Sequence, residues 1–219
     1  MNKTRLKFTD RKKDFSHILE ENNLNYILKK CQDAYESSLV EFNQQEFRKT
    51  MKDIRTNDEY LYDLHEGWMM EDILTTKMAK ILLKKDIILQ QNGSEITEEG
   101  RKISHGKITS KSDLVICKGN KKLHMEIQFS NKERVFYDIK ETKIKNAKKE
   151  NGLIFTFCLP LGEGFIADPK SDSFSFFQKT NNIGWGGKKS FRISHSDIHN
   201  IGGFMNLEKF CEIIWKKLK

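Results

Sequence analysis

Hydrophobic residues in the first part of the chain recur at intervals of three and four, the spacing of one face of a helix. Within residues 1–60 this spacing predicts two or three helices, and it predicts a further, clearer helix over 66–85. The apolar stripe of that clearer helix consists of Met70, Ile73, Leu74, Met78, Ile81 and Leu82. We therefore expect the chain to begin with a helical segment.

Short apolar runs replace the helical spacing in the centre of the chain. They predict strands at 112–118, 122–129 and 153–159, with a basic helix at about 133–150 between the last two. The third run is almost entirely apolar, as expected of a strand buried on both faces. This order predicts an α/β fold with a central mixed β-sheet flanked by helices.

The remaining segments carry weaker signals. A short strand is expected at 87–89 and another at 191–194, while the polar, glycine-containing stretch 92–111 is expected to form a loop or a short hairpin. Asn206 is expected to cap a final helix at 207–218. Because there is no repeat or linker, we expect a single domain. Its parts would be a helical segment (1–60), a catalytic core (66–159), and DNA-contacting loops with a C-terminal helix (160–219).

The charge balance points to an anionic partner. The 219 residues include 39 Lys and Arg against 31 Asp and Glu, a net charge of +8, which favours nucleic acid. The other reading is a lysine-rich surface that serves solubility. No apolar run is long enough to span a bilayer and the N-terminus lacks a signal peptide, so we expect a cytoplasmic protein with no membrane partner. The four cysteines have no close pair, which argues against zinc.

Two acids on the central strands are the candidate metal ligands. If these strands pair as a hairpin, Asp113 can lie beside Glu126, and Glu126 shares a face of its strand with Gln128. Mg²⁺ prefers oxygen ligands, and the backbone carbonyl of Ile127 offers a third one. A metal at this position can activate water for phosphodiester hydrolysis. The alternative is a surface hairpin with exposed acids.

Two further side chains are candidates for the same site. The amide of Gln128 cannot carry charge, but it can orient a water molecule by hydrogen bonding. Glu66 extends the apolar stripe of the 66–85 helix towards its N-terminus, so we expect it to face the sheet and join the catalytic site directly or through water. The alternative for Glu66 is a first-turn glutamate that complements the helix dipole.

The stretch Glu126-Ile-Gln-Phe-Ser-Asn131 narrows the class of nuclease that the sequence indicates. With the preceding Asp113, it resembles the BglII-like restriction endonucleases of the PD-(D/E)XK superfamily. The resemblance covers roughly residues 112–158 and implies a restriction-endonuclease-like core. The turn between the two acids is longer here than in that family.

The resemblance also implies roles for individual residues. Asp113 and Glu126 would bind Mg²⁺, and Gln128 would stand where the superfamily usually has lysine. Ser130 and Asn131 would contact DNA near the scissile phosphate or the base edges. The family cuts double-stranded DNA at short palindromes as a homodimer, and no nucleotide cofactor is expected.

Basic residues outside this motif are further candidates for DNA contact. Lys132 and Arg134 follow the second strand at the start of the predicted basic helix and are expected to lie on the DNA backbone. A flexible glycine-rich loop is expected at 184–192, where Lys188, Lys189 and Arg192 would bind phosphates. A solvated helix face and an ordinary hairpin turn are the respective alternatives.

The sequence thus predicts a Type II restriction endonuclease, a Mg²⁺-dependent homodimer that hydrolyses double-stranded DNA at a short palindrome. Two alternatives stay open. One is a nuclease of the same superfamily that acts in DNA repair or recombination without sequence specificity. The other is a non-catalytic DNA-binding protein.

Overall fold

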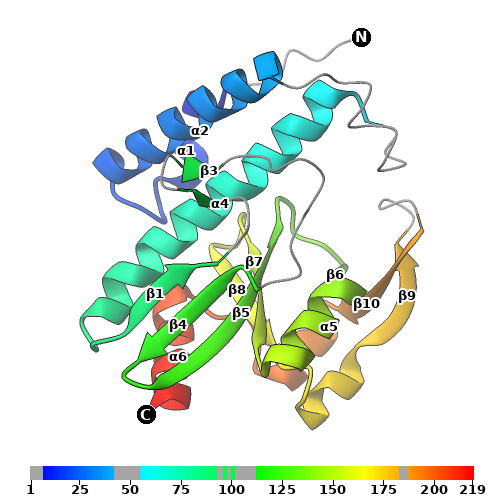
Figure 1. Ribbon diagram of the computed structural model, residues 1–219. Helices are drawn as coiled ribbons and strands as arrows, with labels where there is room; N and C mark the ends of the chain where they lie inside the picture. Colours follow the sequence, from blue (N-terminus) through cyan, green and yellow to red (C-terminus); the bar gives the residue numbers. More distant parts are fainter. Residues whose placement is uncertain (1–6, 42–54, 93–95, 98–99, 102–111, 183–186) are drawn as a thin grey trace. The chain divides into compact units, whose positions relative to one another are not determined.

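The computed structural model describes residues 7–41, 55–92, 96–97, 100–101, 112–182 and 187–219 (Figure 1). They form two compact units. One draws on residues 1–77 and 95–108, and the other on 78–94 and 109–219. The expected single-domain organisation stays a prediction. Most of the predicted loop or hairpin at 92–111 lies outside the described residues.

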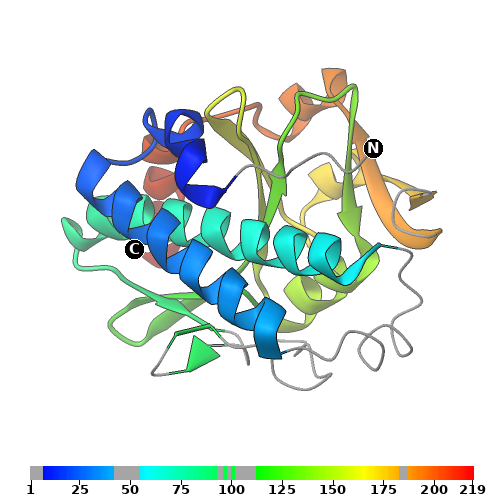
Figure 2. The same ribbon diagram turned by 90° about the horizontal axis from the view of Figure 1, so that it is seen from above.

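The first unit is helical. It contains η1 (Phe8–Arg11), α1 (Lys12–Phe15), α2 (Glu21–Glu41) and most of α4 (Asn57–Leu83), with the short strands β2 (Ile96–Thr97) and β3 (Gly100–Arg101) paired as a hairpin. Figure 2 shows α2 running along α4. The Cys31 Sγ–H donates to the His65 carbonyl at 3.3 Å, and Ser38 Oγ lies 3.0 Å from His65 Nε2, so hydrogen bonds join these two helices.

Helix α4 contains the apolar stripe predicted for residues 66–85. Met70, Leu74 and Met78 are buried, as the helical spacing predicts. The helix is longer than predicted because it begins at Asn57, and its last residues, from Met78, belong to the second unit. Within the described part of the chain, no helix combines the length and apolar character needed to cross a membrane.

The second unit is built on a five-stranded sheet in the order β1-β4-β5-β7-β8 (Figure 1). Strands β5 and β7 are parallel and the other neighbours are antiparallel, so the sheet is mixed. All residues of β7 are buried, as expected from its apolar sequence. The strands are β1 (Ile88–Gln91), β4 (Leu114–Lys118), β5 (Lys121–Ser130), β7 (Leu153–Cys158) and β8 (Glu163–Ala167).

Helices α5 (Glu141–Glu150) and α6 (Leu207–Leu218) cover opposite faces of this sheet. On one face, Asn146 of α5 donates a hydrogen bond to Glu126 of β5. On the other, Phe210 of α6 stacks on Phe155 of β7 at 3.8 Å between ring centroids. Phe155 pairs with Ile127, the neighbour of Glu126, and successive strand residues point to opposite faces. The predicted α/β fold with a mixed sheet flanked by helices is therefore confirmed.

The C-terminal helix was predicted with its cap. The Asn206 side chain accepts a hydrogen bond from the Lys209 backbone N–H at 2.9 Å and so satisfies a free donor of the first turn. Between β8 and α6, the described residues include the short 3₁₀ helices η2 (Asp172–Phe176) and η4 (Ser196–Ile201).

Two local predictions in the second unit were wrong in part. The predicted helix at 133–150 is helical only from Glu141, as α5, because its first part contains the strand β6 (Phe136–Lys140). The predicted strand at 191–194 is confirmed, but it begins earlier, as β10 (Lys188–Ser194), so part of the predicted loop at 184–192 is strand. Residues 183–186 lie outside the described part. Strand β10 pairs with β6 and with β9 (Gln178–Asn182) in a separate three-stranded sheet. Strand β6 is distant from β10 in the sequence, so local periodicity did not reveal their pairing, whereas β9 directly precedes β10 in the chain.

Replacing Gly164 of β8 by alanine is expected to destabilise the fold by about 1–3 kcal/mol. The new Cβ would lie 2.6 Å from the Thr156 carbonyl oxygen and 2.7 Å from the Phe155 ring, and neither can move without disturbing β7. Gly67→Ala in α4 is the control, because its Cβ would meet no described atom within 4 Å. This control is expected to gain about 0.5–1 kcal/mol from helix propensity. Urea denaturation measures both changes, and equal stability of the two variants would contradict the close approach of β8 to β7.

Candidate active site

The hairpin of β4 and β5 places the two predicted acids side by side. Its register pairs Leu114 with Met125, so Asp113, one residue earlier, lies across from Glu126. The connecting turn is short because Lys118 still pairs with Lys121, and it uses a left-handed glycine, Gly119, at φ +55°. The long interval between the acids in the sequence is therefore taken up by paired strand rather than by loop.

A lysine from α5 joins these acids. The ammonium of Lys143 donates to Asp113 Oδ2 at 2.7 Å, to Glu126 Oε2 at 2.9 Å and to the Ile127 carbonyl oxygen at 2.8 Å. Asp113 Oδ2 also accepts the Ile127 backbone N–H at 2.7 Å, and Asn146 Nδ2 donates to Glu126 Oε1 at 3.3 Å. The three oxygens around the ammonium are the three predicted metal ligands.

The cluster is largely withdrawn from solvent. The side chain of Glu126 is 3% exposed, and those of Asp113 and Lys143 are about one-fifth exposed. Burial raises the pKa of Glu126, an effect that Lys143 opposes. Burial would lower the pKa of Lys143, but the charges of Asp113 and Glu126 outweigh it and hold that pKa above its ordinary value. Two carboxylates against one ammonium leave an excess of one negative charge when all three are ionised.

These residues fit a hard divalent cation. Two carboxylate oxygens and one backbone carbonyl converge on a single point, and the ammonium at that point stands in for a cation. Among the described residues, no group of three or more His, Cys, Asp and Glu side chains is placed to hold a metal. The two carboxylates and the backbone carbonyl would be the protein's ligands, and Mg²⁺ prefers to retain several waters beside such ligands.

Gln128 is half-buried beside this cluster but is directed elsewhere. Its Nε2 donates to the Asp138 backbone carbonyl of β6, and its Oε1 has no hydrogen-bond partner in the described part of the chain. Thr156 of β7 pairs with Gln128 of β5, and its buried hydroxyl likewise has no hydrogen-bond partner among the described residues. Buried polar atoms of this kind commonly bind ordered water. The water-orienting role of Gln128 stays a prediction.

The residues predicted to contact DNA after β5 fall into two groups. Ser130 is 5% exposed and acts within the protein, because its hydroxyl donates to the Lys132 carbonyl and accepts from Arg134 Nε at 3.2 Å. Asn131, Lys132 and Arg134 are exposed. Lys132 and Arg134 lie in the irregular segment between β5 and β6, rather than on the predicted helix.

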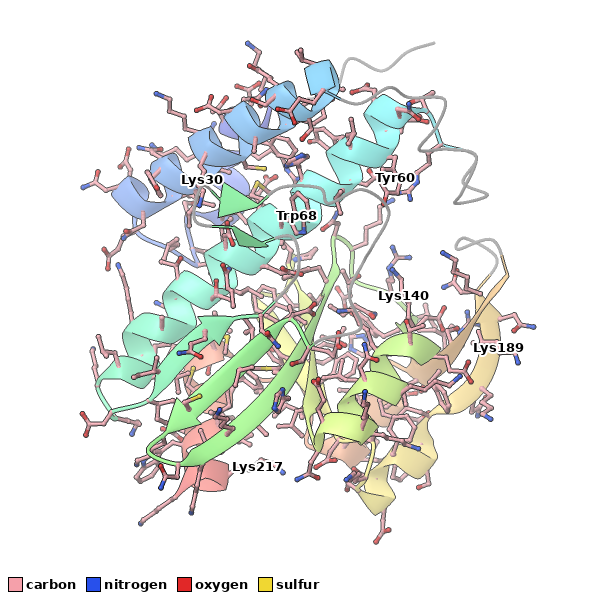
Figure 3. The ribbon with its side chains drawn as sticks, viewed as in Figure 1. Lys30, Tyr60, Trp68, Lys140, Lys189 and Lys217 are labelled. Carbon is pink, nitrogen blue, oxygen red and sulfur yellow. The ribbon has the colours of Figure 1, made fainter. Side chains whose placement is uncertain are left out.

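The basic residues of β10 lie on the three-stranded sheet. Lys188 and Lys189 are exposed, whereas Arg192 forms a two-pronged ion pair with Asp138 through Nε at 2.8 Å and Nη2 at 2.9 Å. Figure 3 labels Lys189 on β10 and Lys140 at the end of β6. A hollow of about 250 Å³ opens here, lined by Glu141, Lys179, Thr180, Asn181, Lys189, Ser190 and Phe191.

Glu66 lies on α4 in the first unit, where it forms an ion pair with Arg11. Helix α4 begins at Asn57, so Glu66 lies in the helix interior. It is therefore not a first-turn glutamate that complements the helix dipole, which was the alternative prediction. Its predicted part in the catalytic site stays a prediction.

Sequence reasoning missed Lys143 and Asn146 as members of the cluster. Lys143 was one of many basic residues in a segment predicted as a single long helix. The informative signal was the start of α5 at Glu141, because Ile144 and Ala147 then face the core, and Lys143 and Asn146 each immediately precede one of them. A helix starting near 133 gives no reason to single out this pair.

Comparisons with known proteins add little to this geometry. No family model and no curated protein matches the chain. Among solved structures, the 1.6 Å structure of Hjc, a Holliday junction resolvase from the archaeal hyperthermophile Archaeoglobus fulgidus, is similar over 64% of this chain and 93% of that chain. The identity is 10% and the TM-score 0.39. The function therefore has to be argued from the site.

Proposed function

We propose that this protein is a Mg²⁺-dependent deoxyribonuclease with a site of the PD-(D/E)XK type. One observation carries the proposal: oxygens of Asp113, Glu126 and Ile127 all lie within 2.9 Å of the Lys143 ammonium. A buried carboxylate pair is unfavourable unless cations compensate it, so this cluster is built around positive charge. The arrangement suits a metal site better than an exposed surface hairpin.

Each residue then has a defined task. Asp113, Glu126 and the Ile127 carbonyl would hold the metal, which when bound supplies an acidified water and neutralises phosphate charge. Lys143 would provide the positive charge that the superfamily usually takes from the position of Gln128. With a metal present, its ammonium is available to a phosphate oxygen or to the attacking water. Asn146 keeps Glu126 oriented through its hydrogen bond.

The finer proposal is a Type II restriction endonuclease that cuts duplex DNA at a short palindrome as a homodimer. It is supported by the resemblance of the Glu126–Asn131 stretch and by the exposed cations near it. Lys132 and Arg134 follow the strand that carries Glu126, and Lys188 and Lys189 lie on β10. Such cations bind phosphates without reading sequence, so they position the DNA rather than select a site.

The test is cleavage of bacteriophage DNA by the purified protein with Mg²⁺. Discrete bands are expected, and chelation of the metal by EDTA should abolish them. Sequencing of the fragment ends would then identify the recognition site and the cut position. Bands that require Mg²⁺ would support both the chemistry and the restriction function.

Other outcomes separate the alternatives. A metal-dependent smear would support a nuclease without sequence specificity, of the kind used in repair or recombination, and would contradict the restriction function. DNA binding without cleavage under Mg²⁺ or Mn²⁺ would contradict the nuclease proposal and favour a non-catalytic DNA-binding protein.

A further inference from the structure

The segment between β5 and β6 presents apolar side chains to solvent. All residues from 131 to 136 are exposed, and two neighbours among them are large and apolar. Val135 is 72% exposed and Phe136, the first residue of β6, is 49% exposed. Single exposed apolar residues are ordinary, but an adjacent pair that includes an aromatic ring suggests a contact surface. We refer to this pair as the Val135–Phe136 tip.

The tip is held in place by hydrogen bonds on both sides. The His195 backbone N–H donates to the Val135 carbonyl at 2.7 Å. Upstream, Ser130 donates to the Lys132 carbonyl and accepts from Arg134 at 3.2 Å. A partner would therefore meet a preformed surface and little conformational entropy would be lost on binding.

Cations outnumber acids around the tip. Its segment carries Lys132 and Arg134 against one acid, Glu133. The guanidinium carbon of Arg192, which is paired with Asp138, lies 5.4 Å from the centroid of the Phe136 ring. Cations flanking an exposed aromatic ring form a combination that suits nucleic acid, where phosphates alternate with flat bases. A protein partner with an apolar patch and no acidic residues would gain nothing from these cations.

The segment that carries the tip begins near the proposed active site. Strand β5 carries Glu126 and ends at Ser130, four residues later. At about 3.3 Å per residue this is roughly 13 Å, comparable to four base steps of 3.4 Å. DNA whose scissile phosphate lies at Glu126 would therefore have bases close to the segment that carries the tip.

We propose that Phe136, flanked by Val135, contacts a nucleobase of the DNA substrate by entering a base step as an apolar wedge or by stacking on an unstacked base. The inference rests on the proposed nuclease function and adds a contact that phosphate-binding cations cannot provide. Apolar wedges unstack a base step, which is least unfavourable at mismatched or unpaired positions. The protein is therefore expected to bind DNA that contains such a position more tightly than a perfect duplex.

The test measures DNA binding by fluorescence anisotropy in EDTA, where no cleavage occurs. The probes are a labelled duplex and the same duplex with a central mismatch. Phe136→Ala is expected to weaken binding to the mismatched duplex about tenfold, while Phe136→Trp retains it. Phe176→Ala is the matched control, because Phe176 is 41% exposed but lies on η2.

Salt dependence separates a base contact from a phosphate contact. Phe136→Ala should leave the slope of log affinity against log salt unchanged, because an apolar contact releases no counterion. Lys132→Ala should reduce that slope by about one. Wild-type affinity in Phe136→Ala would overturn the inference, as would a shift of this variant from dimer to monomer, which would make the tip a contact between copies of the chain. Failure of the wild type to bind any DNA would instead overturn the proposed function.

Discussion

Glu126→Gln is expected to reduce DNA cleavage about a thousandfold, equivalent to about 4 kcal/mol of transition-state stabilisation. The substitution keeps the size of a side chain that is 3% exposed but removes one of the two carboxylates that would hold the metal. The hydrogen bond from Asn146 can persist to the remaining carbonyl oxygen, so the fold should be retained. Cleavage is measured with Mg²⁺, DNA binding by anisotropy in EDTA, and metal binding by calorimetry.

Glu141→Gln is the control for this prediction. Glu141 lies in the first turn of the neighbouring helix α5 and pairs with the exposed Lys145. The Glu141→Gln variant should cleave DNA like the wild type. Normal cleavage by Glu126→Gln would show that the acid is misassigned, whereas loss of DNA binding together with cleavage would indicate a structural role.

Lys143→Met is expected to have opposite effects on metal affinity and on cleavage. Removing the ammonium takes away the cation that shares the three ligand oxygens, so Mg²⁺ or Mn²⁺ should bind at least tenfold more tightly. The scale of the effect is plausible because unit charges about 4 Å apart interact by about 4 kcal/mol at an effective dielectric constant of 20. Cleavage should nevertheless fall about a hundredfold, because the charge near the phosphate is lost.

Stability gives a second measurement of the same substitution. Without metal, Lys143→Met leaves Asp113 and Glu126 without their cation, a loss of about 3 kcal/mol for a buried pair. Added Mg²⁺ should therefore raise the unfolding temperature of this variant more than that of the wild type. Lys145→Met, on the same helix with a side chain 69% exposed, is the control and should match the wild type. Unchanged metal affinity in Lys143→Met would contradict the proposal that the metal and the Lys143 ammonium share the same three oxygens.

The hairpin at the centre of the site could be predicted because its signals are local. Two strand-like runs joined by a turn set the register, and the alternation of β5 decides that Glu126 and Gln128 share a face. The apolar sequence of β7, the stripe of α4 and the Asn206 cap of α6 are equally local, and all of these predictions were confirmed.

The two predictions that were wrong in part have different causes. Residues 136–140 form a strand only because β10, about 50 residues further along, pairs with them. That pairing also placed Arg192 against Asp138, whereas Lys188 and Lys189 are part of β10 through their pairing with β9. A local pattern of basic residues could not distinguish a helix from a short strand followed by a helix.

The sequence by itself determined that Asp113 and Glu126 lie side by side, because neighbours on a strand and partners in a tight hairpin are placed by the geometry of a few residues. Only the tertiary structure decided which cation meets them. Lys143 reaches Asp113 and Glu126 because α5 starts at Glu141 and packs Ile144 and Ala147 against the sheet. Gln128 turns to β6 through the Asp138 carbonyl instead. The partners of Lys143 and Gln128 depend on packing between segments that are distant in sequence. In that packing, the burial of apolar side chains sets the direction of the polar side chains beside them.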